Sequence, residues 1–140
     1  MGEARALQEQ NIQHWNAHDS AAWVGDFSPD AKVVGPVAGG SGTEMVKTFY
    51  SIWQDAFPDN EVHVNNIFED GGTTILQAEF HGTHTEAMNA PDQTIPASGR
   101  RVNIPFATID KVDGGKITEF TLYFDRAELL GQLGLLPTPA

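Results

Sequence analysis

The chain has no cysteine among its 140 residues, which excludes disulfide bonds, thiolate nucleophiles and cysteine-based metal sites. Basic residues are scarce as well, because eight Lys and Arg stand against nineteen Asp and Glu, and the formal net charge is −11. Such a charge repels nucleic-acid phosphates and anionic lipids, so we expect neither nucleic acid nor a membrane as a partner. The sequence also lacks an apolar run of membrane-spanning length and an apolar signal core. We therefore expect a cytoplasmic protein.

The residues that are present describe a globular domain. Hydrophobic residues make up 40% of the sequence and include three Trp and eight Phe, which is typical of a packed core and argues against disorder. A chain of this length forms one domain that buries roughly two-thirds of its unfolded surface. We predict a single domain over residues 1–137 and a loose C-terminal tail at 138–140.

Hydrophobic periodicity predicts helices first and strands afterwards. Helical spacing covers 3–17, 20–27 and 43–57, where Asp19 and Thr43 would act as N-caps. The predicted strands are 31–37, 61–69, 73–84, 101–112 and 116–124. Asp125 follows the last strand and is better explained as the N-cap of a short helix ending at 133 than as a catalytic acid. Helices that precede an antiparallel sheet indicate an α+β fold, with the helices packed on one face of a curved sheet.

Alternation along the strands predicts which side chains face the space between sheet and helices. Even-numbered positions carry the apolar residues, so this face should point inward unless a bulge near Asp113-Gly114-Gly115 exchanges the faces. An apolar cavity with a few polar groups suits a small organic ligand. The predicted ligand-binding residues are Asn11, Trp15, Trp53, Leu76, Phe80, Ile104, Phe106, Thr108, Phe120, Leu122 and Phe124.

Three residues are candidates for proton transfer. His84 shares the inward face and would lie at the pocket mouth, where imidazole can act as acid or base; alternatively, its hydrogen bonds fix the long flap at 85–98. Asp110 could have a raised pKa in its apolar strand, or it could lie in water at a frayed hairpin end. His14, on the first helix, would orient or polarise the substrate.

Other polar residues point to no cofactor. His14 and His18 lie four residues apart on the predicted first helix, but no third ligand accompanies them, so we predict no metal site. Arg100 and Arg101 follow the C-terminal end of the flap in the sequence. They would be solvated, lie in a dimer interface, or anchor a ligand carboxylate.

Several short motifs follow one another in a consistent order. They are Gly82-Thr83-His84, Ser98-Gly99-Arg100-Arg101-Val102, Gly115-Lys116-Ile117 and Gln132-Leu133-Gly134-Leu135-Leu136-Pro137. With Trp15-Asn16-Ala17-His18-Asp19 near the N-terminus, the chain resembles the SnoaL-like branch of the nuclear transport factor 2-like superfamily. The resemblance implies a cone-shaped sheet around the N-terminal helices that encloses one pocket. It also implies a homodimer formed by the outer sheet face, which carries Thr121 and Tyr123.

The resemblance does not extend to the catalytic residues. Similar polyketide cyclases use an aspartate on the last strand, an asparagine on the first strand, and a glutamine and a histidine on the penultimate strand. Those positions hold Leu122, Gly35, Phe106 and Thr108 here. Similar ketosteroid isomerases use two carboxylates and a tyrosine, at positions that hold Gly35, Ala107 and Asn11. Neither known catalytic set is retained, so the fold alone does not establish an activity.

Three interpretations of function remain open. The first is a cofactor-independent enzyme that cyclises, isomerises or dehydrates a hydrophobic, polyketide-like metabolite by acid/base chemistry. The second is a binding protein that holds a hydrophobic small molecule without changing it. The third is an assembly domain, which predicts that side chains fill the cavity.

Overall fold

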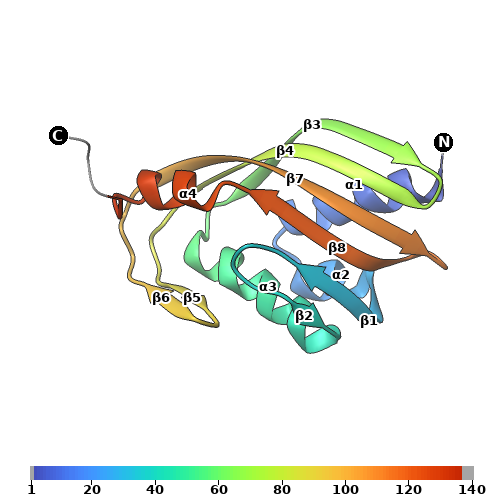
Figure 1. The fold of residues 1–140 in the computed structure, drawn as a ribbon, viewed down its shortest axis with the longest axis horizontal. Coiled ribbons are helices and arrows are strands. Elements are labelled where there is room, and N and C mark those ends of the chain that lie inside the picture. The colour runs from blue at the N-terminus through green and yellow to red at the C-terminus, as the bar shows by residue number, and fades with distance from the viewer. Residues whose placement is uncertain (1, 137–140) are drawn as a thin grey trace.

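The structure, a computed structural model, describes residues 2–136, and the predicted tail at 138–140 lies outside them. Four helices and eight strands follow one another in the order shown in Figure 1. They are α1 (Glu3–Asn16), α2 (Ser20–Gly25), β1 (Phe27–Val34), β2 (Gly40–Ser41), α3 (Thr43–Ala56), β3 (Glu61–Asp70), β4 (Thr73–Thr83), β5 (Met88–Ala90), β6 (Gln93–Ile95), β7 (Arg101–Asp113), β8 (Lys116–Phe124) and α4 (Arg126–Gln132).

The main sheet has six strands in the order β2-β1-β8-β7-β4-β3. It curves over α1, α2 and α3, which lie together on one of its sides (Figure 1). The α+β prediction is confirmed, but the prediction of a fully antiparallel sheet was wrong because β1 runs parallel to β8. The alternation of apolar and polar residues along a strand does not reveal whether the strand pairs with its neighbour in parallel or antiparallel. The partners are far apart in sequence, and the long chain between them supplies the crossover that parallel pairing requires.

The predicted flap at 85–98 contains a short hairpin. Its strands β5 and β6 pair through Met88 with Ile95 and through Ala90 with Gln93. Met88 and Ile95 are 1% and 7% exposed, so two apolar side chains attach the hairpin to the core. Pro91 occupies the turn between the two strands, where its fixed φ is tolerated.

Two of the three predicted helix caps are confirmed. The Asp19 carboxylate accepts the Ala22 amide at 3.1 Å, and the Asp125 carboxylate accepts the Ala127 and Glu128 amides at 2.9 and 3.2 Å. Helix α3 begins at Thr43, so its N-cap is Gly42, with φ of 97°. Across residues 2–136, no helix is both long enough and apolar enough to cross a membrane.

The inward face of the sheet follows the predicted alternation. The register of β7 against β8 shifts between Lys111 and Val112, close to the predicted bulge. This shift lies beyond Asp110, so the even positions of β7 before it stay on one face. Phe106 is therefore opposite Phe124, and Ile104 is opposite Phe80 of β4.

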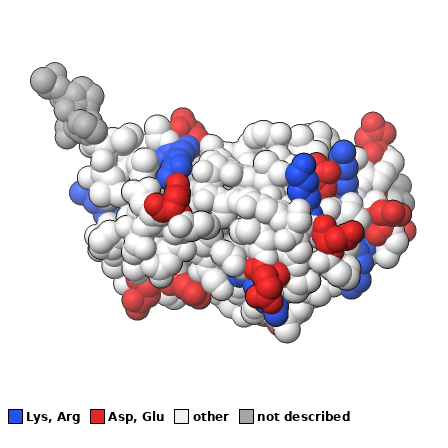
Figure 2. Space-filling view, turned by 60° about the horizontal axis from the view of Figure 1, so that its bottom comes forward, with Lys and Arg blue, Asp and Glu red and all other residues white. Residues whose placement is uncertain are grey.

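Charged residues on the molecular surface lie in small groups. On the face shown in Figure 2, blue and red groups are adjacent or scattered around broad uncharged areas. This face has no extended basic patch of the kind that binds nucleic acid.

Candidate functional site

A cavity lies between the inner face of the sheet and the helices. Its wall is almost entirely apolar and aromatic, with Asn11, Gln8 and Thr108 as the polar members. The lining consists of Gln8, Asn11, Ile12, Trp15, Trp23, Phe49, Trp53, Val62, Leu76, Phe80, Ile104, Phe106, Thr108, Phe120, Leu122 and Phe124. All the residues predicted to bind ligand are therefore brought to one wall, and their role in binding stays a prediction. The interpretation as an assembly domain predicted that side chains fill this space, whereas a cavity is present.

Sequence reasoning missed part of this wall. Gln8 and Ile12 lie on α1 at helical spacing from Asn11 and Trp15, so the same periodicity could have identified them. The other missed residues are Trp23, Phe49 and Val62. Their direction depends on how α2, α3 and β3 pack, which local spacing does not determine.

The cavity is narrow and has a volume of about 60 Å³. Pockets for drug-sized ligands have roughly 300–1,000 Å³, so this conformation admits a small molecule or one part of a larger one. Phe106 and Phe124 are only partly buried although they face inward, which marks the end that solvent reaches. At the other end, Thr108 and Leu76 are each 1% exposed.

Asp110 lies two residues beyond Thr108 on β7 and is not among the residues that line the cavity. It is fully buried between its strand partners Thr74 and Phe120, so the expectation of a frayed, hydrated position was wrong. Strand β7 continues to Asp113, and α1 covers this part of the sheet. Burial raises the pKa of the Asp110 carboxyl to about 8, because a charge is poorly solvated there. The Thr108 hydroxyl lowers this pKa slightly, although it falls short of hydrogen-bond geometry.

The closed end gathers four buried polar side chains. Thr74 donates its hydroxyl to Gln8 Oε1 at 2.9 Å. Among the described residues, Gln8 Nε2, Thr108 Oγ1 and both carboxyl oxygens of Asp110 have no hydrogen-bond partner. Each unsatisfied buried group costs about 1–3 kcal/mol. Such a concentration is unusual in a folded core, where buried polar groups are normally hydrogen-bonded.

His84 is buried beneath the flap, away from the cavity wall. Its Nδ1 accepts the Ser98 amide at 3.2 Å and lies 2.9 Å from the Ser98 hydroxyl, while its ring stacks on Phe57 at 5.2 Å. The predicted position at the pocket mouth was therefore wrong, because the chain turns under residues 85–98 after β4 ends. Burial lowers the pKa of His84, which keeps the ring neutral as an acceptor. The contacts are those of the alternative interpretation, in which His84 fixes the flap.

His14 also lies outside the cavity wall. Its Nδ1 is 2.8 Å from Asp26 Oδ2, and the same buried carboxylate accepts from Gln10 at 2.8 Å and from Asn11 at 2.9 Å. This network ties α1 to the start of β1 and orients Asn11 at the wall. His14 therefore belongs to a hydrogen-bond network behind the cavity and not to its wall. Within residues 2–136, no three His, Asp or Glu side chains are grouped to hold a metal ion.

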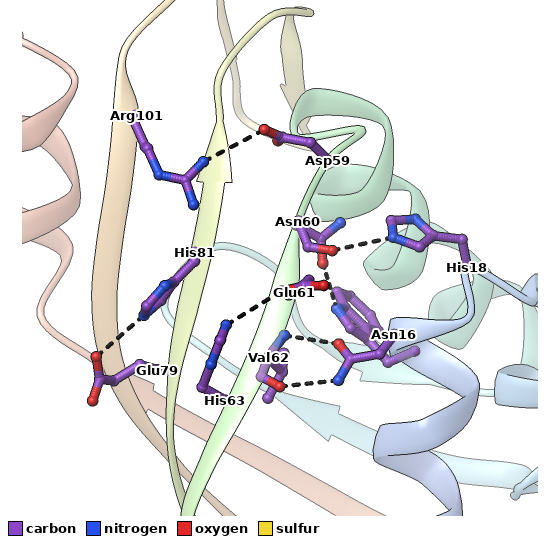
Figure 3. Close-up of polar contacts among 11 residues, drawn as sticks. Asn16, His18, Asp59, Asn60, Glu61, Val62, His63, Glu79, His81 and Arg101 are labelled. Atoms are coloured by element: carbon purple, nitrogen blue, oxygen red, sulfur yellow. Dashed lines mark hydrogen bonds and ion pairs between the residues drawn. The ribbon is translucent and has the colours of Figure 1, made fainter.

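Trp15 is held by a buried amide behind the cavity. Its Nε1 donates to Asn60 Oδ1 at 2.8 Å, and Asn60 Nδ2 donates to Gln54 Oε1 at 2.7 Å and to the Phe57 carbonyl at 2.8 Å. Figure 3 shows Asn60 between His18 and the start of β3, with the His18 ring directed at the Asn60 carbonyl. Asn60 is thus a hydrogen-bond hub that fixes the position of Trp15 on the cavity wall.

Comparison with known proteins agrees with this geometry. The family model described as SnoaL-like polyketide cyclase matches residues 5–133. A candidate SnoaL-like polyketide cyclase from Jannaschia sp. CCS1 superposes with a TM-score of 0.84 at 20% identity, covering 96% of this chain and 94% of the other. AclR, a candidate hydroxylase from Streptomyces galilaeus, gives 0.80 at 25% identity, with coverage of 97% and 87%.

IdmH, a candidate polyketide cyclase from Streptomyces antibioticus, gives a TM-score of 0.77 at 21% identity, with coverage of 95% and 99%. No protein with a curated description matches the sequence. The solved structures confirm the nuclear transport factor 2-like fold. Because the family model spans nearly all of the residues that build the cone and its cavity, this chain belongs to the SnoaL-like polyketide cyclase family.

Proposed function

We propose that this protein is a cofactor-independent acid/base enzyme that acts on a hydrophobic carbonyl compound, with Asp110 as the proton carrier. The observation that supports the proposal is a fully buried carboxyl with a pKa of about 8, two residues along β7 from Thr108 on the wall of an apolar cavity. General acids and bases work best when their pKa lies near the working pH. Cyclisation, isomerisation and dehydration all use such proton transfer beside a carbonyl group.

The polar end of the cavity would serve this chemistry. Asp110 titrates near pH 8, so its carboxylate can take the proton from the carbon beside a substrate carbonyl, and the protonated acid can then return a proton to the substrate. Thr108 and Gln8 belong to the cavity wall, and their polar atoms, unsatisfied among the described residues, would orient the carbonyl oxygen. The surrounding apolar wall strengthens each interaction, because electrostatic attraction grows as the local dielectric falls.

Proton exchange into a small ketone tests the proposal. Cyclohexanone in deuterated buffer should exchange its α-protons faster with the protein than without it, as measured by proton NMR. Asp110→Asn should reduce this acceleration at least a hundredfold, the low end for a general acid/base. His84→Ala should retain it, since His84 lies beneath the flap. Full exchange in the folded Asp110→Asn protein would refute the assignment.

A non-catalytic binding protein is the second candidate. It is favoured by Leu122 and Phe106, which line the cavity at positions where similar cyclases carry catalytic residues. Native mass spectrometry of the purified protein separates the two functions. A chemically unaltered molecule that co-purifies and is not turned over would support binding alone.

We also propose that the outer face of the sheet forms a homodimer. Cross-strand partners place one apolar row across five strands: Val34, Thr121, Ile109, Ile75 and Phe68. Phe68, Ile75 and the nearby Tyr123 are 57%, 43% and 56% exposed, and burying them between two copies would remove apolar surface from water.

Ile75→Lys should therefore shift the sedimentation coefficient from dimer to monomer, because it places a charge at the centre of the row. Ser51→Lys, on α3 away from this face, is the matched control and should leave the assembly unchanged. A wild-type protein that sediments as a monomer at micromolar concentration would contradict the dimer.

A further inference from the structure

We infer that His84 is an acid-sensitive latch, and that protonation of its ring releases the flap at 85–98 from the body of the domain. The latch is separate from the proposed proton carrier, because Asp110 pairs with Thr74 at the start of β4 whereas His84 follows the end of that strand. The inference is carried by the hydrogen bonds of one buried imidazole, whose acceptor nitrogen loses them once it is protonated.

The two ends of the flap meet at His84. The His84 amide donates to the Arg100 carbonyl at 2.9 Å, and the Gly99 amide donates to the His84 carbonyl at 2.8 Å. Between these ends, the hairpin of β5 and β6 forms a sheet of its own, separate in the described chain from the six-stranded sheet. Near the hairpin turn, Arg126 Nη2 donates to Gln93 Oε1 at 3.1 Å in an exposed contact. The buried bonds of His84 therefore lie where the flap joins the domain.

The His84 ring is held in one protonation state. Its Nδ1 accepts the Ser98 amide at 3.2 Å and lies 2.9 Å from the Ser98 hydroxyl. A backbone amide can only donate, so Nδ1 is unprotonated and the proton of the neutral ring lies on Nε2. Burial lowers the pKa of this ring, because a charge there would be poorly solvated. The closed flap therefore requires a neutral histidine with its proton on Nε2.

A second proton would break this arrangement. It can enter the ring only at Nδ1, which would then direct an N–H at the N–H of Ser98 and lose the bond that closes the flap. The charged ring would also be buried against Phe57, on which it stacks at 5.2 Å. An open flap returns the ring to water, so proton binding and flap opening favour each other.

The charged side chains around His84 are engaged elsewhere. They are Asp59 in the turn after α3, Glu86 in the flap, and Arg100 and Arg101 at the end of the flap. Asp59 lies 3.6 Å from Arg101 (Figure 3), the Arg100 guanidinium packs over Gly134, and Glu86 is exposed. Burial alone accounts for the lowered pKa of His84, so these charges do not offset the cost of protonating it.

Acid should favour the open flap. The pKa of the closed ring lies below its ordinary value of 6.5, so the open form binds more protons as pH falls past that value. While the closed ring stays neutral, the equilibrium constant for opening should rise about tenfold from pH 7.5 to pH 5.5. Asp110 acts in the opposite direction, because its raised pKa stabilises the fold in acid. Global unfolding therefore does not mimic the release.

Hydrogen exchange in ¹⁵N-labelled protein, followed by NMR at pH 7.5 and pH 5.5, tests the latch. The reporters are the Ser98, Gly99 and Glu86 amides, which donate to His84 Nδ1, to the His84 carbonyl and to the Ala56 carbonyl. Their protection factors, corrected for the intrinsic pH dependence of exchange, should fall about tenfold in acid. His84→Gln offers an amide oxygen in place of Nδ1 and does not titrate, so its protection factors should be equal at both pH values.

Two controls separate the latch from general effects of acid. His63→Gln replaces an exposed histidine of β3 and should retain the tenfold fall in protection. The Trp15 indole signal should stay in place, because Asn60 accepts its proton at 2.8 Å away from the flap. The ¹⁵N shifts of the His84 ring also report its protonation state directly in the wild type, so the assignment is tested even where a variant does not fold.

Three results would overturn the inference. They are flap protection that is unchanged between the two pH values, an equal loss of protection in His84→Gln, and a neutral His84 ring that carries its proton on Nδ1. None of these measurements depends on turnover, so the latch and the proposed proton transfer by Asp110 stand or fall separately.

Discussion

Asp110→Asn should make the protein more stable at pH 8 by a few kcal/mol while removing its proposed activity. The carboxyl is fully buried, and within the described chain neither of its oxygens has a hydrogen-bond partner. In the folded protein its pKa is about 8, against an ordinary value of 3.8. Asparagine has nearly the same shape as the protonated acid and carries no charge at any pH, so it avoids the burial of a carboxylate.

The pH dependence of this effect has a definite sign. Between about pH 4 and pH 8 the folded protein keeps the Asp110 proton, whereas the unfolded chain has released it. The unfolded state then binds fewer protons, so the free energy of unfolding falls as pH rises, by about 1.4 kcal/mol per pH unit for this one group. The stabilising contribution is complete below pH 4 and is lost as pH rises toward 8.

Urea denaturation of the wild type and Asp110→Asn at pH 4, 6 and 8 measures the difference. The two proteins should be similar at pH 4 and diverge in favour of the variant at higher pH. Asp26→Asn is the matched control, because Asp26 is a buried carboxylate that accepts from Gln10, Asn11 and His14. It should destabilise the protein. A constant difference between wild type and Asp110→Asn across this pH range would show that Asp110 titrates normally.

A group that destabilises the fold at working pH is informative about function. Natural chains retain strained or unsatisfied groups mainly where activity requires them. The closed end of the cavity fits this pattern, since Gln8, Thr108 and Asp110 could all be replaced by apolar residues of similar size.

The inner face of the sheet could be predicted from the sequence because strand side chains alternate with a period of two. Phe80, Phe106 and Leu122 lie on one face, and the register shift falls after Asp110, where it does not exchange them. The helix caps at Asp19 and Asp125 were predictable for a similar reason, since each depends on contacts within a few residues.

The polar chemistry of the site could not be predicted in the same way. Whether Asp110 meets water or protein depends on how α1 packs on the sheet, where Gln8 accepts from Thr74, the β4 partner of Asp110, across a sequence separation of 66 residues. His84 shares the inward parity, but it lies beyond the last residue of β4, where the path of the flap determines its surroundings. Parity identifies the face of a strand, and tertiary packing determines what lies above that face.

Asn60→Ala should destabilise the protein by about 3 kcal/mol, a large effect for a polar residue outside the cavity wall. Asn60 is fully buried, and its side chain forms three hydrogen bonds, with Trp15 Nε1, Gln54 Oε1 and the Phe57 carbonyl. Truncation leaves Trp15 Nε1 and Gln54 Oε1 unsatisfied, and each costs about 1–3 kcal/mol, while the Phe57 carbonyl still accepts the backbone amide of residue 60 at 3.0 Å. The variant should also loosen Trp15 and so disturb the cavity wall.

Asn66→Ala is the matched control for this substitution. It removes the same group from β3, where Asn66 donates to Gln77 at 2.7 Å on the exposed outer face, and it should change stability by less than about 0.5 kcal/mol. Thermal unfolding followed by circular dichroism compares the two variants, and the Trp15 indole signal reports the wall directly. Equal losses of stability in both variants would mean that the buried hydrogen bonds of Asn60 contribute no more than those of an exposed amide. A large loss confined to Asn60→Ala would show that the hub joining α1, α3 and β3 holds the helices against the sheet and keeps the cavity open.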